Sequence, residues 1–269
     1  MKSGFQLGAD AVRLRERYSV RYFIGPWAPG LVALAALKPG EHVLDVACGT
    51  GLIARLAAPA VGATGRITAI DINPNMLAVA RSLAPPPGGA VAWVEGDAGA
   101  MGFPSASFDV VLCQQGLQFF PDKPAALREM HRVLVPGGRV LLSVWKSAGP
   151  YNTAVAEALE RYAGPEAATQ YRASRVVPSA EALHRLLVEA GFGAVDIRPV
   201  AMTIRLPSLE SFVLGHLSGG TVASTVAALG SDQRVALARQ VELALRPFAD
   251  GDGVAVPDEI NVAIGQRQG

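Results

Sequence analysis

Short apolar runs alternate with longer amphipathic stretches through the first half of the chain. Between the apolar runs, hydrophobic positions recur at helical spacing, with Asn73 and Asp122 placed as helix caps and Pro74 in a first turn. Strands that alternate with helices in this way predict a parallel, doubly wound sheet, whose ligand lies beyond the carboxyl ends of the strands. The predicted strands span residues 43–46, 65–71, 91–94, 108–113 and 139–145.

The second half of the chain has a looser pattern. Ser179 is placed to cap a helix, and Pro199 within a strand favours a position near the sheet edge or a bulge. Gly219-Gly220 and Gly230-Ser231 break a long apolar helical stretch into three helices. The predicted elements are helices over 151–162 and 179–191, a strand over 194–206, three helices over 208–248 and a last strand over 259–266.

Composition and charge exclude several classes of protein. The 269 residues are 50% hydrophobic and 17% charged, as in a compact globular protein, and the formal net charge is +1 with no cluster of Lys and Arg. We therefore predict no nucleic-acid partner. No N-terminal apolar signal core is present, and no run approaches the ~18 apolar residues of a membrane span. No integral membrane span and a cytoplasmic location are the resulting predictions.

Cysteine and histidine are too dispersed for a metal centre. Cys48 and Cys113 each end an apolar run, and the four histidines are scattered along the chain. A metal site needs clustered ligands, so no metal is predicted. A disulfide between the two cysteines stays open at this point.

One glycine turn stands out, in the stretch V-L-D-V-A-C-G-T-G at residues 43–51. The apolar residues before it predict a strand and those after it predict a helix, so Gly49 and Gly51 lie in a strand-to-helix turn. Such a turn lets a ligand approach bare backbone and points the N–H groups of the helix start at it. A tight turn without a ligand is the alternative.

Three acids favour the ligand. Asp45 lies in the first strand, Asp71 ends the second and Asp97 follows the third, so a parallel sheet brings all three to one rim beside the glycine turn. Asp71 follows Gly51 by twenty positions, the distance at which an acid can accept both hydroxyls of a ribose. These residues predict a nucleoside site.

The acid in the first strand distinguishes two kinds of nucleoside. Residues 49–54 read G-T-G-L-I-A and also fit the G-x-G-x-x-A fingerprint of a dinucleotide site. Asp45, however, would repel a pyrophosphate placed on this turn. A ligand with a cationic head and an amino-acid end would gain from that carboxylate, and S-adenosylmethionine is such a ligand.

Five motifs in order carry a family resemblance. The motifs are V-L-D-V-A-C-G-T-G, A-I-D-I-N-P-N-M-L, E-G-D-A, F-D-V-V-L-C-Q-Q-G-L-Q-F-F-P-D and V-L-V-P-G-G-R-V, and the resemblance covers about residues 41–145. Together they resemble the motifs of class I S-adenosylmethionine-dependent methyltransferases, in the branch with the ubiquinone/menaquinone C-methyltransferases and many small-molecule methyltransferases. We predict an α/β fold with a Rossmann-like, doubly wound, seven-stranded sheet. The sheet is mostly parallel with an antiparallel last strand, and N-terminal helices and a helical insert before the last strand accompany it.

The resemblance implies a set of cofactor-binding residues. The turn that holds the methionine part comprises Asp45, Ala47, Cys48, Gly49 and Gly51. Asp71 would bind the ribose hydroxyls, Ile72 and Met76 would lie beside the adenine, Asp97 would meet its amino group, Ala98 would meet its ring edge and Gln114 would lie near the methionine amino group.

Two positions depart from the family pattern. Ala47 replaces the first glycine of D-x-G-x-G-x-G, a change small enough to leave the turn plausible. Leu117-Gln118-Phe119 stands where many relatives read L-H-H, so a histidine base at that place is missing and no catalytic base is assigned. Gln118 also gives modest support to a protein that binds the cofactor without transferring methyl groups.

Further side chains are candidates for the acceptor site or for a lid over it. An aromatic group of Tyr18, Tyr22, Phe23 and Trp27 either staples the N-terminal helices or covers the site. Tyr151 follows the fifth strand, where a substrate loop would begin, and His216 lies near the Gly219-Gly220 break. Gln118 completes this set.

The predicted function is methyl transfer from S-adenosylmethionine to a C, O or N atom of a small, apolar acceptor that is quinone-like or secondary-metabolite-like. A dinucleotide-dependent oxidoreductase is the less favoured alternative, besides a cofactor-binding protein without transfer. The predicted units are a helical cap over 1–40, a cofactor-binding core over 41–207 and 257–269, and a helical insert over 208–256 that acts as substrate lid. A homodimer is left open.

Overall fold

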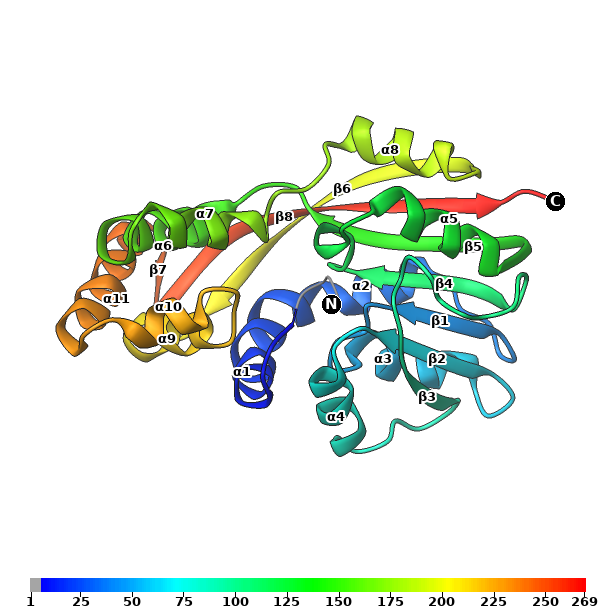
Figure 1. Cartoon of the computed structure of the whole chain (residues 1–269), viewed down its shortest axis with the longest axis horizontal. Coiled ribbons are helices and arrows are strands. Elements are labelled where there is room, and N and C mark those ends of the chain that lie inside the picture. The colour runs from blue at the N-terminus through cyan, green and yellow to red at the C-terminus, as the bar shows by residue number, and fades with distance from the viewer. Residues whose placement is uncertain (1–5) are drawn as a thin grey trace.

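A computed structural model describes residues 6–269, and its centre is one twisted sheet (Figure 1). The strand order is β3-β2-β1-β4-β5-β8-β6, and the short β7 pairs with β8. Strands β1 to β5 run parallel, whereas β8 is antiparallel to both β5 and β6. The strands are β1 (His42–Val46), β2 (Arg66–Asp71), β3 (Ala90–Glu95), β4 (Phe108–Gln114), β5 (Leu134–Trp145), β6 (Phe192–Leu206), β7 (Ala249–Asp250) and β8 (Gly253–Arg267).

This architecture confirms the predicted fold class. Seven strands make the doubly wound sheet, with the antiparallel strand last in the chain, and the two-residue β7 is the addition. Pro199 lies in β6 at the edge of the sheet, where a residue without an N–H group is tolerated.

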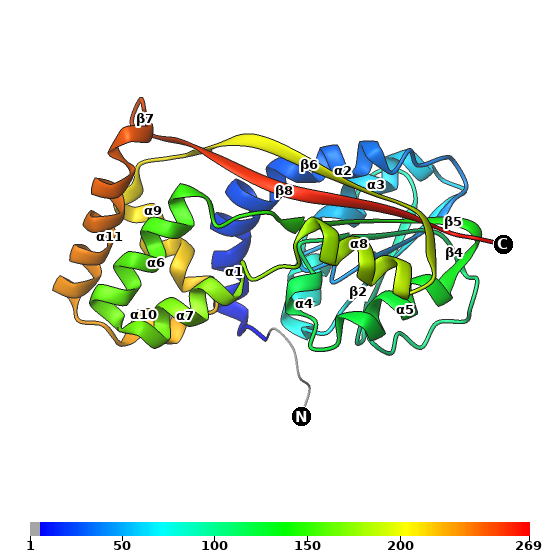
Figure 2. The same cartoon turned by 90° about the horizontal axis from the view of Figure 1, so that it is seen from above.

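Helices cover both faces of the sheet. Alternate residues of each strand point to opposite faces, so the apolar runs supply two separate cores. One core joins the sheet to α2 and α3, and the other joins it to α5 and α8 (Figure 2). The helices are α2 (Ala28–Leu34), α3 (Leu52–Val61), α4 (Pro74–Ser82), α5 (Lys123–Val133) and α8 (Ala180–Glu189).

The predicted helix caps are confirmed. The side chains of Asn73, Asp122 and Ser179 accept hydrogen bonds from backbone N–H groups in the first turns of α4, α5 and α8. Each cap satisfies a donor that the helix itself cannot pair. These helices therefore begin where the sequence pattern places them.

Five more helices gather at one end of the molecule, beyond the sheet (Figure 1). Within this helical body α11 packs against both α6 and α9. The breaks predicted within 208–248 separate α9, α10 and α11, but α7 was not predicted, and α6 and α7 fall in the range assigned above to the core. The helices are α6 (Gly149–Ala163), α7 (Pro165–Ala173), α9 (Leu209–Ser218), α10 (Ala223–Ala228) and α11 (Ser231–Leu245).

Strands β6 and β8 connect the helical body to the sheet. Their pairing continues from Phe192↔Arg267 to Leu206↔Val254, whereas β5 pairs with β8 only over the part from Ile260 to Gln266. The remaining halves of β6 and β8 leave the sheet as a two-stranded ribbon that runs along one side of the molecule (Figure 2).

The N-terminal segment lies between the sheet and the helical body (Figure 2). It contains α1 (Ala9–Arg15), the π-helix η1 (Glu16–Ile24) and the 3-10 turn η2 (Gly25–Trp27). A π-helix of this length is rare, and π-helical geometry is frequent at functional sites. The predicted cap over 1–40 includes residues 1–5, which lie outside the described residues. Two further 3-10 turns are η3 (Leu117–Phe119) and η4 (Arg246–Phe248).

Searched over residues 6–269, the helices include none with the length and apolar character needed to cross a bilayer.

Candidate active site

The turn between β1 and α3 has the backbone geometry that its glycines allow. Gly49 and Gly51 have φ of 55° and 87°, in the left-handed region. A Cβ at Gly51 would lie 2.2 Å from the ring of Trp93, so this position excludes any side chain. Ala47 also has a positive φ, 55°, which costs about 1 kcal/mol for a residue with a Cβ. The replacement of the family's glycine is therefore accommodated with some strain.

Asp45 and Asp71 hold this turn from inside. The Asp45 carboxylate is 1% exposed and accepts a hydrogen bond from the Ala54 N–H at 3.0 Å. The Asp71 carboxylate accepts from the N–H groups of Gly49 and Asn73, both at 2.8 Å. Burial raises the pKa of Asp45 to about 8, and the charge of Asp71 adds to this effect. Burial also raises the pKa of Asp71, against its backbone hydrogen bonds and the charge of Arg15.

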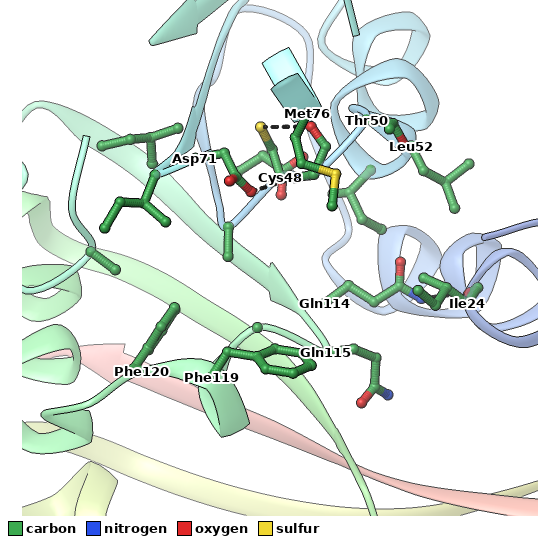
Figure 3. A pocket seen from close by; sticks show the side chains of 18 of the residues that line it. Ile24, Cys48, Thr50, Leu52, Asp71, Met76, Gln114, Gln115, Phe119 and Phe120 are labelled. Carbon is green, nitrogen blue, oxygen red and sulfur yellow. Dashed lines mark hydrogen bonds between the residues drawn. The ribbon is translucent and has the colours of Figure 1, made fainter. Parts of the chain in front are cut away.

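A large cavity opens in front of the turn (Figure 3). We call it the cofactor cavity; its open space is about 1020 Å³. Ten of the eleven predicted cofactor residues line it, and Gly51 does not, because it faces Trp93. The ten are Asp45, Ala47, Cys48, Gly49, Asp71, Ile72, Met76, Asp97, Ala98 and Gln114. The structure thus brings together residues from four strand ends, while their individual roles stay predictions.

Several lining residues were missed by sequence reasoning. Arg15 and Ile24 come from the N-terminal segment, and Gln115 and Phe119 follow β4. Burial lowers the pKa of Arg15 to about 10, opposed by the charges of Asp71 and Glu16, so its guanidinium stays a cation at neutral pH. The Gln114 amide nitrogen donates to the Ile24 carbonyl at 2.9 Å, which fastens the end of η1 to β4 (Figure 3).

A second chamber adjoins the cofactor cavity. Both are lined by Arg15, Ile24, Gln115 and Phe119, so the two cavities lie side by side and meet at those four residues. The second chamber has about 630 Å³ of open space. Its other lining residues are Ser19, Phe23, Gln118, Trp145, Asn152, Tyr171, Ser174, Arg175, His216, Leu217, Gly220, Thr221 and Val222.

Polar pairs brace the wall of the second chamber. His216 Nδ1 lies 2.9 Å from the Tyr151 hydroxyl, and the Tyr171 hydroxyl donates to Asn152 at 2.8 Å. Burial, with the charges of Arg15 and Arg175, lowers the pKa of His216 to about 3, so its imidazole is neutral at physiological pH. A neutral histidine with this pKa is a poor general base.

The candidate residues for the acceptor site or its lid divide into two groups. Phe23, Gln118 and His216 line the second chamber, whereas Tyr18, Tyr22 and Tyr151 line neither cavity. The rings of Tyr18 and Tyr22 instead pack edge-on against Phe212 of α9, at centroid distances of 5.6 and 5.2 Å. This packing joins the N-terminal segment to the helical body, and the choice between a staple and a lid stays a prediction.

Metal and disulfide chemistry find no support in the described part of the chain. Cys48 and Cys113 are both free and buried, so the disulfide left open above is not formed. Among residues 6–269, no group of three or more His, Cys, Asp or Glu side chains could hold a metal ion.

Comparisons with known proteins give the family. Residues 44–142 match the family described as Methyltransferase domain. The ubiquinone/menaquinone biosynthesis C-methyltransferase UbiE of Ectopseudomonas mendocina is 38% identical over 185 residues, 63% of this chain and 72% of that protein. The UbiE of Laribacter hongkongensis is 35% identical over 181 residues, 63% of this chain and 74% of that protein. The chain belongs to the UbiE family of class I S-adenosylmethionine-dependent methyltransferases.

The fold likeness extends beyond this family. A phosphoethanolamine N-methyltransferase 2 of Haemonchus contortus, solved in complex with S-adenosyl-L-methionine, superposes with a TM-score of 0.62 at 19% identity. The match covers 97% of this chain and 58% of that one. Membership of the UbiE family makes the protein a methyltransferase with S-adenosyl-L-methionine as its cofactor, which confirms the predicted activity and contradicts the oxidoreductase alternative. Location, dimerisation and the lack of a nucleic-acid partner stay predictions.

Proposed function

We propose that this methyltransferase moves a methyl group to a carbon atom of a small quinone-like acceptor held in the second chamber. The names of its relatives, C-methyltransferases of ubiquinone and menaquinone biosynthesis, support the acceptor class and the carbon target. The observation that carries the proposal is the shared wall of the two cavities, formed by Arg15, Ile24, Gln115 and Phe119. A methyl group can pass between two ligands only where their sites adjoin.

The residues of the cofactor cavity fit S-adenosylmethionine at its methionine end. The buried carboxylate of Asp45 suits a cationic group. It lies beside the turn of Ala47, Cys48 and Gly49, in which Ala47 and Gly49 are left-handed and the backbone is accessible. Gln114 donates its amide N–H to Ile24, which leaves its amide oxygen as the group able to accept from an ammonium. Gly51 would act by permitting the turn rather than by contact.

The nucleoside end has a matching set of groups. Asp71 ends β2 at the cavity and would accept from the ribose hydroxyls. Ile72 and Met76 supply an apolar wall for the adenine, with Asp97 and Ala98 at its edge. When bound, the cofactor supplies a methyl carbon on a sulfonium, and it leaves as S-adenosylhomocysteine.

The chain's own contribution is alignment and exclusion of water. Transfer is an in-line displacement, so the acceptor carbon must be held on the line of the carbon–sulfur bond. Segment η1 covers the junction of the two cavities, with Val20 and Ile24 facing the cofactor cavity and Ser19 and Phe23 facing the second chamber. We therefore assign this segment the part of a lid, together with the helical body that it contacts through Phe212.

Thr221 offers a direct test. A Thr221→Trp change would put an indole ring into the second chamber, since Thr221 is part of its wall, and Thr221 does not line the cofactor cavity. We expect it to abolish transfer of a labelled methyl group to 1,4-naphthoquinol, while calorimetry still shows S-adenosylmethionine binding. Val235→Trp, on an exposed position of α11, is the control and should retain transfer.

Two results would contradict the proposal. Undiminished transfer by Thr221→Trp would remove the acceptor from the second chamber. Failure of the wild-type protein to methylate any quinol or quinone of this size would remove the acceptor class.

A further inference from the structure

Two buried amide side chains lie unpaired in the wall of the second chamber. Gln115 and Gln118 are 4% and 9% exposed, and no nitrogen or oxygen atom of either amide has a hydrogen-bond partner. Both residues line the chamber, and Gln115 also lines the cofactor cavity. Buried amides without partners are costly, and native proteins seldom keep them without a reason. The unpaired N–H groups and oxygens of these amides are therefore candidates to hydrogen-bond the polar groups of a ligand.

The backbone at Gln115 strengthens this interpretation. Its φ is 53°, in the left-handed region that residues with a side chain seldom adopt. Backbone strain of this kind gathers at ligand sites, where the surrounding structure holds the residue in place. Figure 3 shows the result: Gln114 reaches toward Ile24, whereas the next side chain, Gln115, extends away from the glycine turn beside Phe119. The side chains of these two adjacent glutamines therefore point in different directions.

The charged side chains in the wall of the second chamber are arginines. Arg15 and Arg175 both line the second chamber, and no Asp or Glu does so among the residues that the structure describes. Arg175 is fixed by its ion pair with Asp258, at 3.2 Å, and by its position 3.6 Å above the ring of Trp145. The Asp258 carboxylate does not line the chamber itself; it holds Arg175 in place.

We propose that the acceptor binds as an oxyanion, an enolate or a phenolate, whose ring oxygens are held by the amides of Gln115 and Gln118 between the two arginines. This inference rests on the proposed function, and it specifies the ionised form and the recognition of the acceptor. The ring itself would lie against the apolar part of the wall, at Phe23, Trp145 and Val222.

An ionised acceptor also accounts for the missing base. In the transfer, the electron pair of the ring carbon forms the bond to the methyl group and the carbon–sulfur pair stays on sulfur. The negative charge of the acceptor and the positive charge of the sulfonium disappear together, and the ring hydrogen then leaves as a proton to water. No side chain has to create the nucleophile, which agrees with a neutral His216 of low pKa.

The test compares two naphthoquinones of nearly the same shape. 2-Hydroxy-1,4-naphthoquinone is an acidic enol that is ionised at neutral pH, whereas 2-methoxy-1,4-naphthoquinone cannot ionise. Calorimetry in the presence of S-adenosylhomocysteine should show the hydroxy compound binding at least about tenfold more tightly, since hydrogen bonds to a charged group are the stronger ones.

Variants of Gln118 assign the effect to the amide. Gln118→Glu keeps the shape but adds a negative charge, so it should weaken binding of the hydroxy compound by about tenfold or more and leave the methoxy compound nearly unchanged. Gln118→Met keeps the length without the amide and should weaken the hydroxy compound less. Gln266→Glu, the same chemical change at an exposed position of β8, should alter neither.

Equal binding of the two naphthoquinones by the wild-type protein would overturn the inference. So would an equal loss of both compounds in Gln118→Glu and Gln118→Met, because a merely structural role predicts that result. If the protein methylates 1,4-naphthoquinol but binds the two naphthoquinones equally, this inference is wrong and the proposed function stands. Preference for the anion without transfer to any quinol would instead overturn the proposed function.

Discussion

Asp45 couples cofactor binding to the release of a proton. Its carboxylate is buried and receives one hydrogen bond, from the Ala54 N–H, and its pKa is raised to about 8 by burial and by the charge of Asp71. At pH 7 about nine tenths of the free protein therefore carries a protonated Asp45. A cationic ligand placed against this group favours the ionised form, so the proton must leave as the cofactor binds.

The size of the coupling follows from the pKa. Binding of S-adenosylmethionine should release about 0.9 proton from Asp45 at pH 7 and about 0.5 proton at pH 8. The contribution of Asp45 to affinity should accordingly rise about ninefold between pH 6 and pH 7, about fivefold between pH 7 and pH 8, and level off above pH 9.

Calorimetry in two buffers of equal pH but different ionisation enthalpy counts the protons directly. Asp45→Asn is the matched control, because its amide oxygen can still accept from the Ala54 N–H but the residue no longer titrates. The amino group of the cofactor titrates equally against both proteins, so their difference isolates Asp45. Equal proton release by the wild type and Asp45→Asn at pH 7 would refute the reasoning.

Three further predictions concern the same turn. Asp71→Ala should weaken S-adenosylmethionine binding by about 2–3 kcal/mol in a titration. It should also lower the free energy of unfolding, because the N–H groups of Gly49 and Asn73 lose their acceptor. An unchanged dissociation constant would show that Asp71 does not bind the cofactor. The pKa of Asp45 is higher in the folded than in the unfolded state, so the unfolded state binds fewer protons between those two pKa values. The free energy of unfolding should therefore fall as the pH rises from about 4 to about 8. This would be contradicted if urea denaturation showed that the free energy of unfolding of Asp45→Asn falls just as steeply over that pH range. Gly51→Ala should cost more than about 2 kcal/mol, since it combines φ of 87° with a clash on Trp93, whereas Gly251→Ala, with φ of 57° and open space, should cost about 1 kcal/mol; equal losses in chemical denaturation would exclude the clash.

Local patterns were enough to predict the cofactor cavity. Asp45 lies near the end of β1, Asp71 ends β2 and Asp97 follows β3, and the topology alone then places them on one rim. The helix caps were equally readable, since each depends on a side chain and N–H groups two or three residues away.

The second chamber could not be predicted in the same way. Its wall combines residues from the N-terminal segment, α6, α7 and α9, and pairs such as Tyr151 and His216 are 65 positions apart. No sequence period relates such segments; only packing of the helical body brings them together. The strained backbone and unpaired amide of Gln115 are likewise properties of the folded chain, invisible in Q-Q-G-L-Q.

Strand lengths were underestimated for a physical reason. Residues 253–258 read G-V-A-V-P-D, and Gly253 and Pro257 are typical of loops, yet they form the first half of β8. Pro257 pairs with Thr203 in the ribbon, where β8 has lost its second neighbour β5, so a missing N–H group is tolerated.

The ribbon of β6 and β8 has a consequence for how the molecule unfolds. A lid joined by a flexible linker can melt or swing away while the rest stays folded, but here the same two strands complete the sheet and carry the helical body. The pairing of these two strands continues without a register shift from Asp196↔Ile264 to Leu206↔Val254. Unfolding of the helical body would thus remove β6 and β8 from the edge of the sheet. The helical body and the sheet should therefore unfold in a single cooperative transition.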